Sequence, residues 1–280
     1  MQNAFECLKA IHSTFSVFEL FTPDLLHEIE LGVWKNLLIH LLRILQAADP
    51  RLLDVLNERF RKMPVFGRTT IRRFSNNVSE LKQLAAHNYE DILQCALVAF
   101  EGLLEAPHDE IVHDVLFAMA EWHALAKLRM HTEETLKALE DETVTLTTLL
   151  RKFVDITCAA FNASELPRER AARLRRAAKS GASNGSTSTA DDSRAADSTP
   201  SAKSKVFNMN TYKVHSLPDY PEAIREYGTM DSYTTMLVSL AYFVIVPILN
   251  SVDRQRARIR SSRRGTAVRT SATQWRRSGA

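Results

Sequence analysis

Apolar residues recur at steps of three and four between Thr22 and Leu45, which is the spacing of one broad face of an α-helix. The apolar positions of this stretch are Leu25, Leu26, Ile29, Val33, Leu37, Leu38, Leu41, Ile44 and Leu45. The pattern predicts a core helix in which Thr22 is the cap and Pro23 lies in the first turn. Gly32 is the weak point of this helix, because glycine disfavours a helix interior.

The same helical period predicts most of the remaining elements. Expected helices are 50–63 with Asp49 as its cap, 78–87, 89–104, one beginning at His108 with apolar residues as far as Leu128, 132–163, and a short exposed one at 167–179. The β-branched run 143–148 predicts a bend within the long helix. Residues 1–21 fit an amphipathic helical segment, of which 15–21 fit a short strand equally well. The sequence therefore predicts a mainly α protein, an irregular helical bundle with at most one or two short strands.

Composition divides the chain into four regions. They are a helical domain at 1–163, a basic helix end with a Ser- and Ala-rich linker at 164–205, a segment returning to the core at 206–235, and an apolar run with an Arg-rich tail at 236–280. The linker from Ser180 is expected to be disordered, because it has too few apolar groups to offset its ordering entropy. The returning segment is expected to be a strand or turn up to Val214 and then a helix from 218–221 to Gly228.

The tail differs in character from the rest of the chain. The apolar run 236–249 is shorter than the roughly 20 residues that cross a bilayer, and Pro247 interrupts it. Residues 251–280 contain arginine without lysine, and Asp253 is their only acid. This composition favours translation through an unspliced intron or in a shifted frame over a membrane anchor or an RNA-binding tail. It predicts that 236–280 has no native structure.

Composition, charge and cysteine usage indicate an intracellular globular protein. Gly (8) and Pro (9) are scarce, as in helical proteins, and a net charge of +3 is too small by itself to indicate nucleic-acid binding. Cys7, Cys95 and Cys158 lie far apart within apolar helical patterns, which is typical of reduced core residues and not of a disulfide frame or a zinc site. No signal sequence, membrane span or small-molecule substrate is indicated.

Asp24 and His27 are the first candidate functional residues. They lie three residues apart at the start of the first long helix, so they share one face of it. Such a pair can hold a cation or a proton between its two side chains. The alternative is a simple acid–imidazole pair in the first helical turn.

A basic cluster interleaved with Phe60, Phe66 and Phe74 is the second candidate. Its cationic members are Arg61, Lys62, Arg68, Arg72 and Arg73. Arginine forks match phosphate oxygens and aromatic rings stack on bases, so the cluster is a candidate DNA-binding site. The alternative is a solvated helix end above phenylalanines of the core.

Histidines and acids are also concentrated between residues 108 and 131. The group comprises His108, His113, His123, His131, Asp109, Glu110, Asp114 and Glu121. No pair has the HExxH spacing that turns two histidines toward one metal. These residues are therefore interpreted as helix surface.

Four segments, in this order, resemble the Plavaka/KDZ-type transposases of fungal DNA transposons, relatives of the CACTA group. They are PDLLHEIELGVWKNLLIHLLRIL at 23–45, LNERFRKMPVFGRTTIRRFSNNVSELKQLAAHNYEDILQC at 56–95, FEGLLEAPHDEIVHDVLFAMAEWHALAKLRMHTEETLKALE at 100–140 and FNMNTYKVHSLPDYPEAIREYGTMDSYTT at 207–235. Together they cover most of residues 20–235.

The resemblance implies a ribonuclease H-like catalytic core in which three acidic residues bind two Mg²⁺ or Mn²⁺ ions for DNA strand cleavage and transfer. Asp24 matches the family's second carboxylate, with His27 beside it, and 30–163 resembles the helical insertion between that acid and the third. The first acid is expected upstream of Met1. After Tyr233-Thr234-Thr235 the family continues into a GELEH-like helix, which this chain replaces. The resemblance thus implies a truncated, inactive, nuclear remnant with an incomplete metal site at Asp24.

Three functional hypotheses follow. The first is this transposase remnant, with nonspecific DNA affinity through the basic cluster and the run 168–179, and with self-association through uncovered apolar faces. The second is an α-helical protein-interaction module without enzymatic activity. The third, ranked last, is a metal-dependent hydrolase that uses Asp24, His27 and the histidines of 108–131 and requires a stoichiometric divalent metal.

Overall fold

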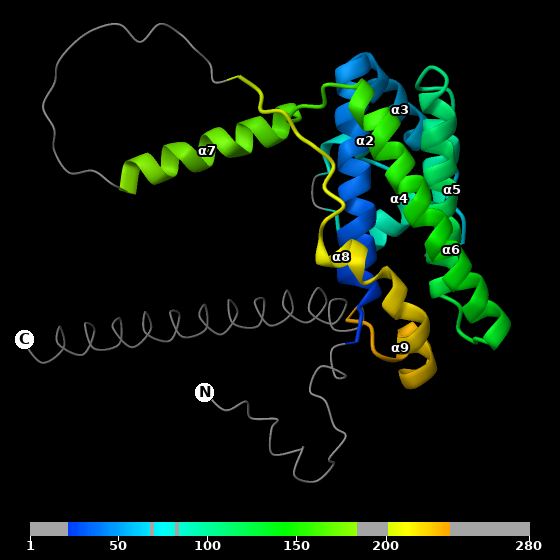
Figure 1. Cartoon of the computed structure of the whole chain (residues 1–280). Helices are drawn as coiled ribbons and strands as arrows, with labels where there is room; N and C mark the ends of the chain where they lie inside the picture. Colours follow the sequence, from blue (N-terminus) through cyan, green and yellow to red (C-terminus); the bar gives the residue numbers. More distant parts are fainter. Residues whose placement is uncertain (1–21, 68–69, 82–83, 184–200, 236–280) are drawn as a thin grey trace, which may run out of the picture. The chain divides into compact units, whose positions relative to one another are not determined.

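The computed structural model describes residues 22–67, 70–81, 84–183 and 201–235. Within them the protein is mainly α, as the sequence predicts, with two isolated β-bridges and no β-strand (Figure 1). No helix of this part of the chain is long and apolar enough to cross a bilayer. The described residues up to Thr234 belong to one compact unit. The predictions for 1–21, for 236–280 and for most of the linker lie outside the described residues.

The first long helix begins later than predicted. Its first part, η2 (Leu25–Trp34), is a π-helix, and α2 (Lys35–Ala48) continues it as a regular α-helix. Asp24 has an extended backbone and occupies the N-cap position, so Thr22 and Pro23 precede the helix and do not cap it. Every apolar position predicted for the core face of this stretch is buried, which confirms that face.

The second helix, α3 (Arg51–Lys62), agrees closely with its prediction. Asp49 precedes it, and its carboxylate accepts the Arg51 backbone N–H at 2.9 Å and the Arg51 guanidinium at 2.8 Å. Leu56 and Phe60 are the apolar residues of this helix that are fully buried, and the helix packs on α2.

The third predicted helix, 78–87, is wrong, since only the 3₁₀ turn η3 (Val78–Glu80) forms. Leu81 has a φ of 48°, a left-handed conformation that does not continue a right-handed helix. α4 (Ala86–Phe100) then begins three residues before its predicted start. The Asn88 side-chain oxygen accepts a backbone N–H from the residue before the helix at 2.9 Å, and this cap sets the start.

α5 (His108–Ala126) and α6 (Glu133–Lys152) form the most extensive helix–helix contact of the described residues. Thr132 caps α6 by accepting a backbone N–H at 3.3 Å, as its position in the sequence predicts. Between the two helices the indole N–H of Trp122 donates to the Thr143 hydroxyl at 2.8 Å. Both groups are buried, so this hydrogen bond fixes the register of the pair.

The irregularity expected at 143–148 falls later in the chain. The threonine hydroxyls of that run donate to backbone carbonyls four residues earlier, for example at 2.7 Å from Thr143 and from Thr148, and the segment stays α-helical. The helix instead widens into the π-helical η4 (Phe153–Cys158). It ends after Ala160, short of the predicted limit.

The basic helix α7 (Pro167–Ser183) forms as predicted and is four residues longer. An antiparallel bridge joins Ser164, just before it, to Ser204. The Lys205 N–H also donates to the Ala163 carbonyl at 2.8 Å, so the chain returns beside the start of α7 after the linker.

The returning segment consists of short helical turns. α8 (Tyr212–His215) occupies the place where a strand or turn was expected, and η5 (Leu217–Asp219) leads into α9 (Tyr220–Tyr227). α9 ends at Gly228, as predicted, and η6 (Met230–Ser232) follows. α8 packs on η2 and α9 packs on α6, so this segment joins the helices formed much earlier in the chain.

One hydrophobic core includes residues from both the early helices and the returning segment. Its largest fully buried side chains are Trp34, Trp122, Tyr220, Phe60, Phe100 and Phe153. Phe207 and Leu217 are buried in the same core. The returning segment is therefore an integral part of the helical domain.

Cys95 and Cys158 are free thiols in or beside this core, in agreement with their prediction, and Cys7 lies outside the described residues. Burial raises the pKa of Cys95 to about 11 and that of Cys158 to about 12. Both thiols are thus protonated and weakly nucleophilic at neutral pH.

His40 on α2 is a polar residue within the apolar core. It is 1% exposed, and neither ring nitrogen has a hydrogen-bond partner among the described residues. Its ring packs against Phe153 and Phe207, with centroid distances of 6.3 and 5.4 Å. Burial, together with the nearby charge of Arg43, lowers the pKa of His40 from 6.5 to about 4.

We expect the free energy of unfolding to fall as the pH decreases from 6.5 to about 4. The His40 ring gains a proton near pH 6.5 in the unfolded chain, but only at about pH 4 in the folded protein. A contribution of about 3 kcal/mol is therefore present above pH 6.5 and is lost toward pH 4. His40→Leu should remove this pH dependence, as measured by urea unfolding on both sides of this pH range. An unchanged pH dependence in the variant would contradict the assignment.

Candidate functional site around Asp24

The structure brings Asp24 and His27 together as the sequence predicts. His27 Nδ1 lies 2.5 Å from Asp24 Oδ2, and the His27 side chain is 58% exposed whereas that of Asp24 is 14% exposed. The Glu28 carboxylate accepts the backbone N–H of Asp24, which satisfies a donor at the start of η2. Acid and imidazole thus form a pair in the first helical turn.

The end of the returning segment reaches the same point. The Thr234 hydroxyl donates to Asp24 Oδ1 at 3.2 Å, across 210 positions of sequence. Lys213 of α8 donates from Nζ to the His27 carbonyl at 2.8 Å. Asp24 and Thr234, which lie near the two ends of the described residues, are therefore in contact.

Gly32 permits this close approach. A Cβ at Gly32 would lie 2.6 Å from Cδ of Lys213 and 2.8 Å from the His27 carbonyl oxygen, both shorter than real Cβ contacts. The Lys213 side chain is flexible and could shift, whereas the His27 carbonyl is backbone, so the space beside that carbonyl is what favours glycine at this position.

Burial and negative charge shape the electrostatics of this site. Burial is the main cause that raises the pKa of Glu28, and the neighbouring charge of Asp24 acts in the same direction. Tyr220 is fully buried, and its hydroxyl has no hydrogen-bond partner among the described residues. Burial raises the pKa of Tyr220, and the charges of Glu28 and Asp24 raise it further.

Sequence reasoning missed four members of this site: Glu28, Lys213, Tyr220 and Thr234. Glu28 alone had a local signal, since it lies one helical turn after Asp24. The other three come from a segment almost 200 residues away. Only tertiary contacts reveal them.

The residues around Asp24 do not fit a pair of Mg²⁺ or Mn²⁺ ions. Both Asp24 side-chain oxygens already face protein partners, Oδ1 the Thr234 hydroxyl and Oδ2 the His27 ring. In the part of the chain that the structure describes, no three His, Cys, Asp or Glu side chains are grouped so that they could hold a metal ion. A metal-dependent reaction therefore has no complete ligand set here.

Three histidines of 108–131 each contact a different residue of the protein. His108 lies 3.3 Å from the Thr157 hydroxyl, His123 lies 3.2 Å from the Glu30 carboxylate, and His131 lies 3.4 Å from the Thr135 hydroxyl. The hydrolase hypothesis requires these imidazoles to meet Asp24 and His27. The described contacts give them different partners.

The basic cluster is largely occupied by intramolecular contacts. The Arg61 guanidinium donates to a backbone carbonyl at 3.2 Å, Lys62 pairs with Glu58 at 2.7 Å, and Arg72 pairs with the buried carboxylate of Asp91 at 3.0 Å. Arg73 is exposed, and Arg68 lies outside the described residues. Phe60 and Phe74 pack together at 5.1 Å, whereas Phe66 is 67% exposed. The cluster is therefore not one open cationic surface.

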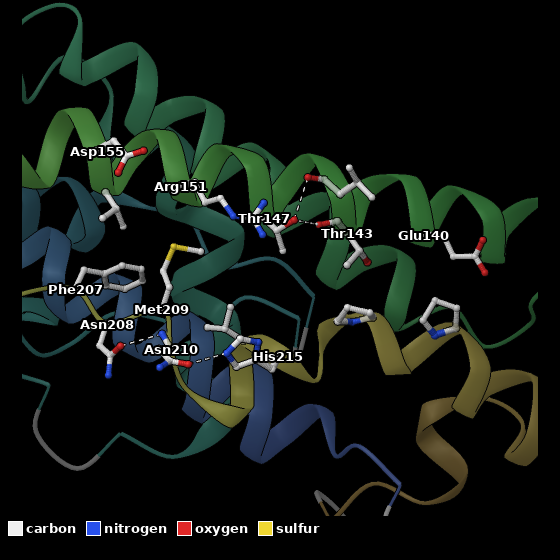
Figure 2. A pocket seen from close by; sticks show the side chains of 15 residues that line it. Glu140, Thr143, Thr147, Arg151, Asp155, Phe207, Asn208, Met209, Asn210 and His215 are labelled. Atoms are coloured by element: carbon white, nitrogen blue, oxygen red, sulfur yellow. Dashed lines mark hydrogen bonds between the residues drawn. The ribbon is translucent and has the colours of Figure 1, made fainter.

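A pocket of about 840 Å³ lies between α6 and the returning segment (Figure 2). Its α6 wall includes Thr143, Thr147 and Arg151, and the threonine hydroxyls are turned back onto the helix backbone. On the opposite wall, Asn210 Oδ1 lies 3.0 Å from Nε2 of His215. The lining is mostly apolar with a few polar groups, which is typical of a pocket that binds a ligand.

No protein-family model, curated protein or solved structure matches this chain. At Asp24, the first described helix meets the end of the returning segment through the Thr234 hydroxyl.

Proposed function

We propose that this protein is a remnant of a fungal DNA transposase of the Plavaka/KDZ type, without catalytic activity and with nonspecific affinity for DNA. The hydrogen bond between Thr234 and Asp24 is the observation that carries the proposal. Asp24 is the position that resembles the family's second carboxylate, and Thr234 belongs to the segment after which the family places its third. An insertion between two acids of one site must begin and end at that site, and the described helices do so.

The same geometry supports the absence of catalysis. Two-metal strand transfer requires several carboxylates around two ions a few ångströms apart. Asp24 is the one residue of the family triad that the resemblance assigns to this chain, and its oxygens contact Thr234 and His27. The helical region is thus a scaffold that holds one ligand of a three-ligand centre.

Sequencing the gene's transcripts across the codons of 235–250 tests this proposal. We expect a spliced transcript in which a Gly-Glu-Leu-Glu-His-like segment follows Thr235, because that segment would deliver a carboxylate next to Asp24. Transcripts that all read straight through to Ala280 would leave Asp24 without a third carboxylate, make the chain an inactive remnant at best, and favour the interaction-module candidate. As a matched biochemical check, the purified chain and its Asp24→Asn variant should show equal, background strand cleavage in Mg²⁺ or Mn²⁺.

The second candidate function is a helical protein-interaction module. The pocket along α6 favours it, because Val144 on that wall is 66% exposed although it is apolar. Size-exclusion chromatography with light scattering separates the two candidates. A module gives a defined oligomer or complex, whereas a remnant gives concentration-dependent aggregates or a monomer that binds DNA.

A further inference from the structure

Helix α7 is anchored at its beginning. Leu166, directly before the helix, is buried, and Glu169 in the first turn pairs with Arg43 of α2 at 2.6 Å. From Arg175 to Lys179 every side chain is exposed. Figure 1 shows α7 as one continuous helix. The turn from Arg175 to Lys179 is thus accessible to a partner.

The two acids of this region are neutralised within the protein. Glu169 accepts hydrogen bonds from Arg43 and from the Leu166 backbone N–H at 3.0 Å. The buried Glu165 carboxylate accepts from Arg173 at 3.0 Å, and Lys205 lies 3.7 Å away. Both carboxylates are therefore paired with arginines of the protein, and the remaining cations of α7 are in excess.

Four of these cations lie along one side of α7. They are Arg168, Arg175, Arg176 and Lys179. The last three follow Arg168 by seven, eight and eleven residues. At the α-helical period this places all four within a stripe that covers roughly 100° around the helix axis and is about 16 Å long. All four are exposed, and none forms an ion pair with another residue that the structure describes. The stripe presents positive charge at several points along one line.

We infer that this stripe binds the phosphate backbone of duplex DNA, an inference that rests on the DNA affinity in the proposed function. Arginine side chains pair with phosphate oxygens and release condensed counterions. A membrane surface is a poorer partner, because an interfacial helix needs an apolar face and α7 offers only Leu174 and alanines. The basic cluster near α3 is also a poorer candidate, since Arg72 and Lys62 are already paired.

Fluorescence anisotropy with a labelled 20-base-pair duplex over a series of salt concentrations tests the inference. The α7 variant is Arg175→Gln, Arg176→Gln and Lys179→Gln together. The control variant is Arg61→Gln, Lys62→Gln and Arg73→Gln, which removes the same charge from exposed positions elsewhere. Circular dichroism verifies that both variants remain folded.

We expect the α7 variant to make the slope of log K against log salt less steep by about 3 and to weaken binding at 0.1 M salt on the order of 100-fold. The control variant should change both quantities far less. If the full chain binds DNA and the control variant weakens it more, the inference about α7 is wrong although the DNA affinity stands. If the full chain does not bind DNA, both fail. Binding to phosphatidylserine vesicles without binding to DNA overturns the choice of partner.

Discussion

Replacing Arg72 with alanine is expected to lower the free energy of unfolding by about 3 kcal/mol. The Arg72 guanidinium contacts both oxygens of Asp91, at 3.0 and 3.1 Å, and the Asp91 side chain is 2% exposed. Removing the arginine leaves a buried carboxylate without its cation, which is costly because water cannot reach it. Chemical denaturation monitored by tryptophan fluorescence measures the loss.

Arg73→Ala is the matched control, because Arg73 is the next residue in the chain, carries the same charge and is exposed. Its substitution should change stability by less than about 0.5 kcal/mol. Equal effects of the two substitutions would mean that the pair with Asp91 contributes little. The comparison also separates a structural arginine from an accessible one within the predicted DNA-binding cluster.

Replacing His123 with leucine should also destabilise the fold by about 3 kcal/mol. His123 Nε2 lies 3.2 Å from Oε1 of Glu30, a residue with no exposed surface. Without the imidazole, the Glu30 carboxyl keeps only Lys127, at 3.8 Å, and its other oxygen already has no partner among the described residues. The measurement is again urea unfolding at neutral pH.

The double variant Glu30→Met and His123→Leu is the decisive comparison for this pair. Replacing both polar partners with apolar side chains of similar size leaves no orphaned group, so its stability should lie within about 1 kcal/mol of the unmodified protein. If the double variant is as unstable as the single one, His123 contributes by packing and not through Glu30. A metal-binding role for His123 predicts instead that added Zn²⁺ or Mn²⁺ raises the melting temperature of the unmodified protein.

The helices could be predicted because their information is local. The period of apolar residues located η2 and α2, α3, α5 and α6, and caps such as Thr132 fixed the start of α6. The errors arose where a few backbone angles or hydrogen bonds decide an outcome. Leu81 in a left-handed conformation ended the helix predicted at 78–87, and the Asn88 side chain moved the start of α4.

Only some residues of the candidate site could be predicted from the sequence. The pairing of Asp24 with His27 follows from their spacing of three residues on one helix. The basic cluster was also visible, but its composition did not reveal that Asp91 holds Arg72 or that Glu58 holds Lys62. Which cations remain accessible depends on where the acids lie after folding. That information is not contained in a run of basic residues.

The sequence by itself determined that this protein is mainly α, where its principal helices lie and which of their faces are buried, because hydrophobic periodicity acts over a few turns. Only the tertiary structure decided that Thr234 meets Asp24, that Lys213 crosses Gly32 and that Tyr220 enters the core beside Trp122. These contacts join residues far apart in the chain. They depend on the packing of the whole core, where buried side chains must fill the available space and buried polar groups must find hydrogen-bond partners. No local sequence pattern specifies which residues meet in this way.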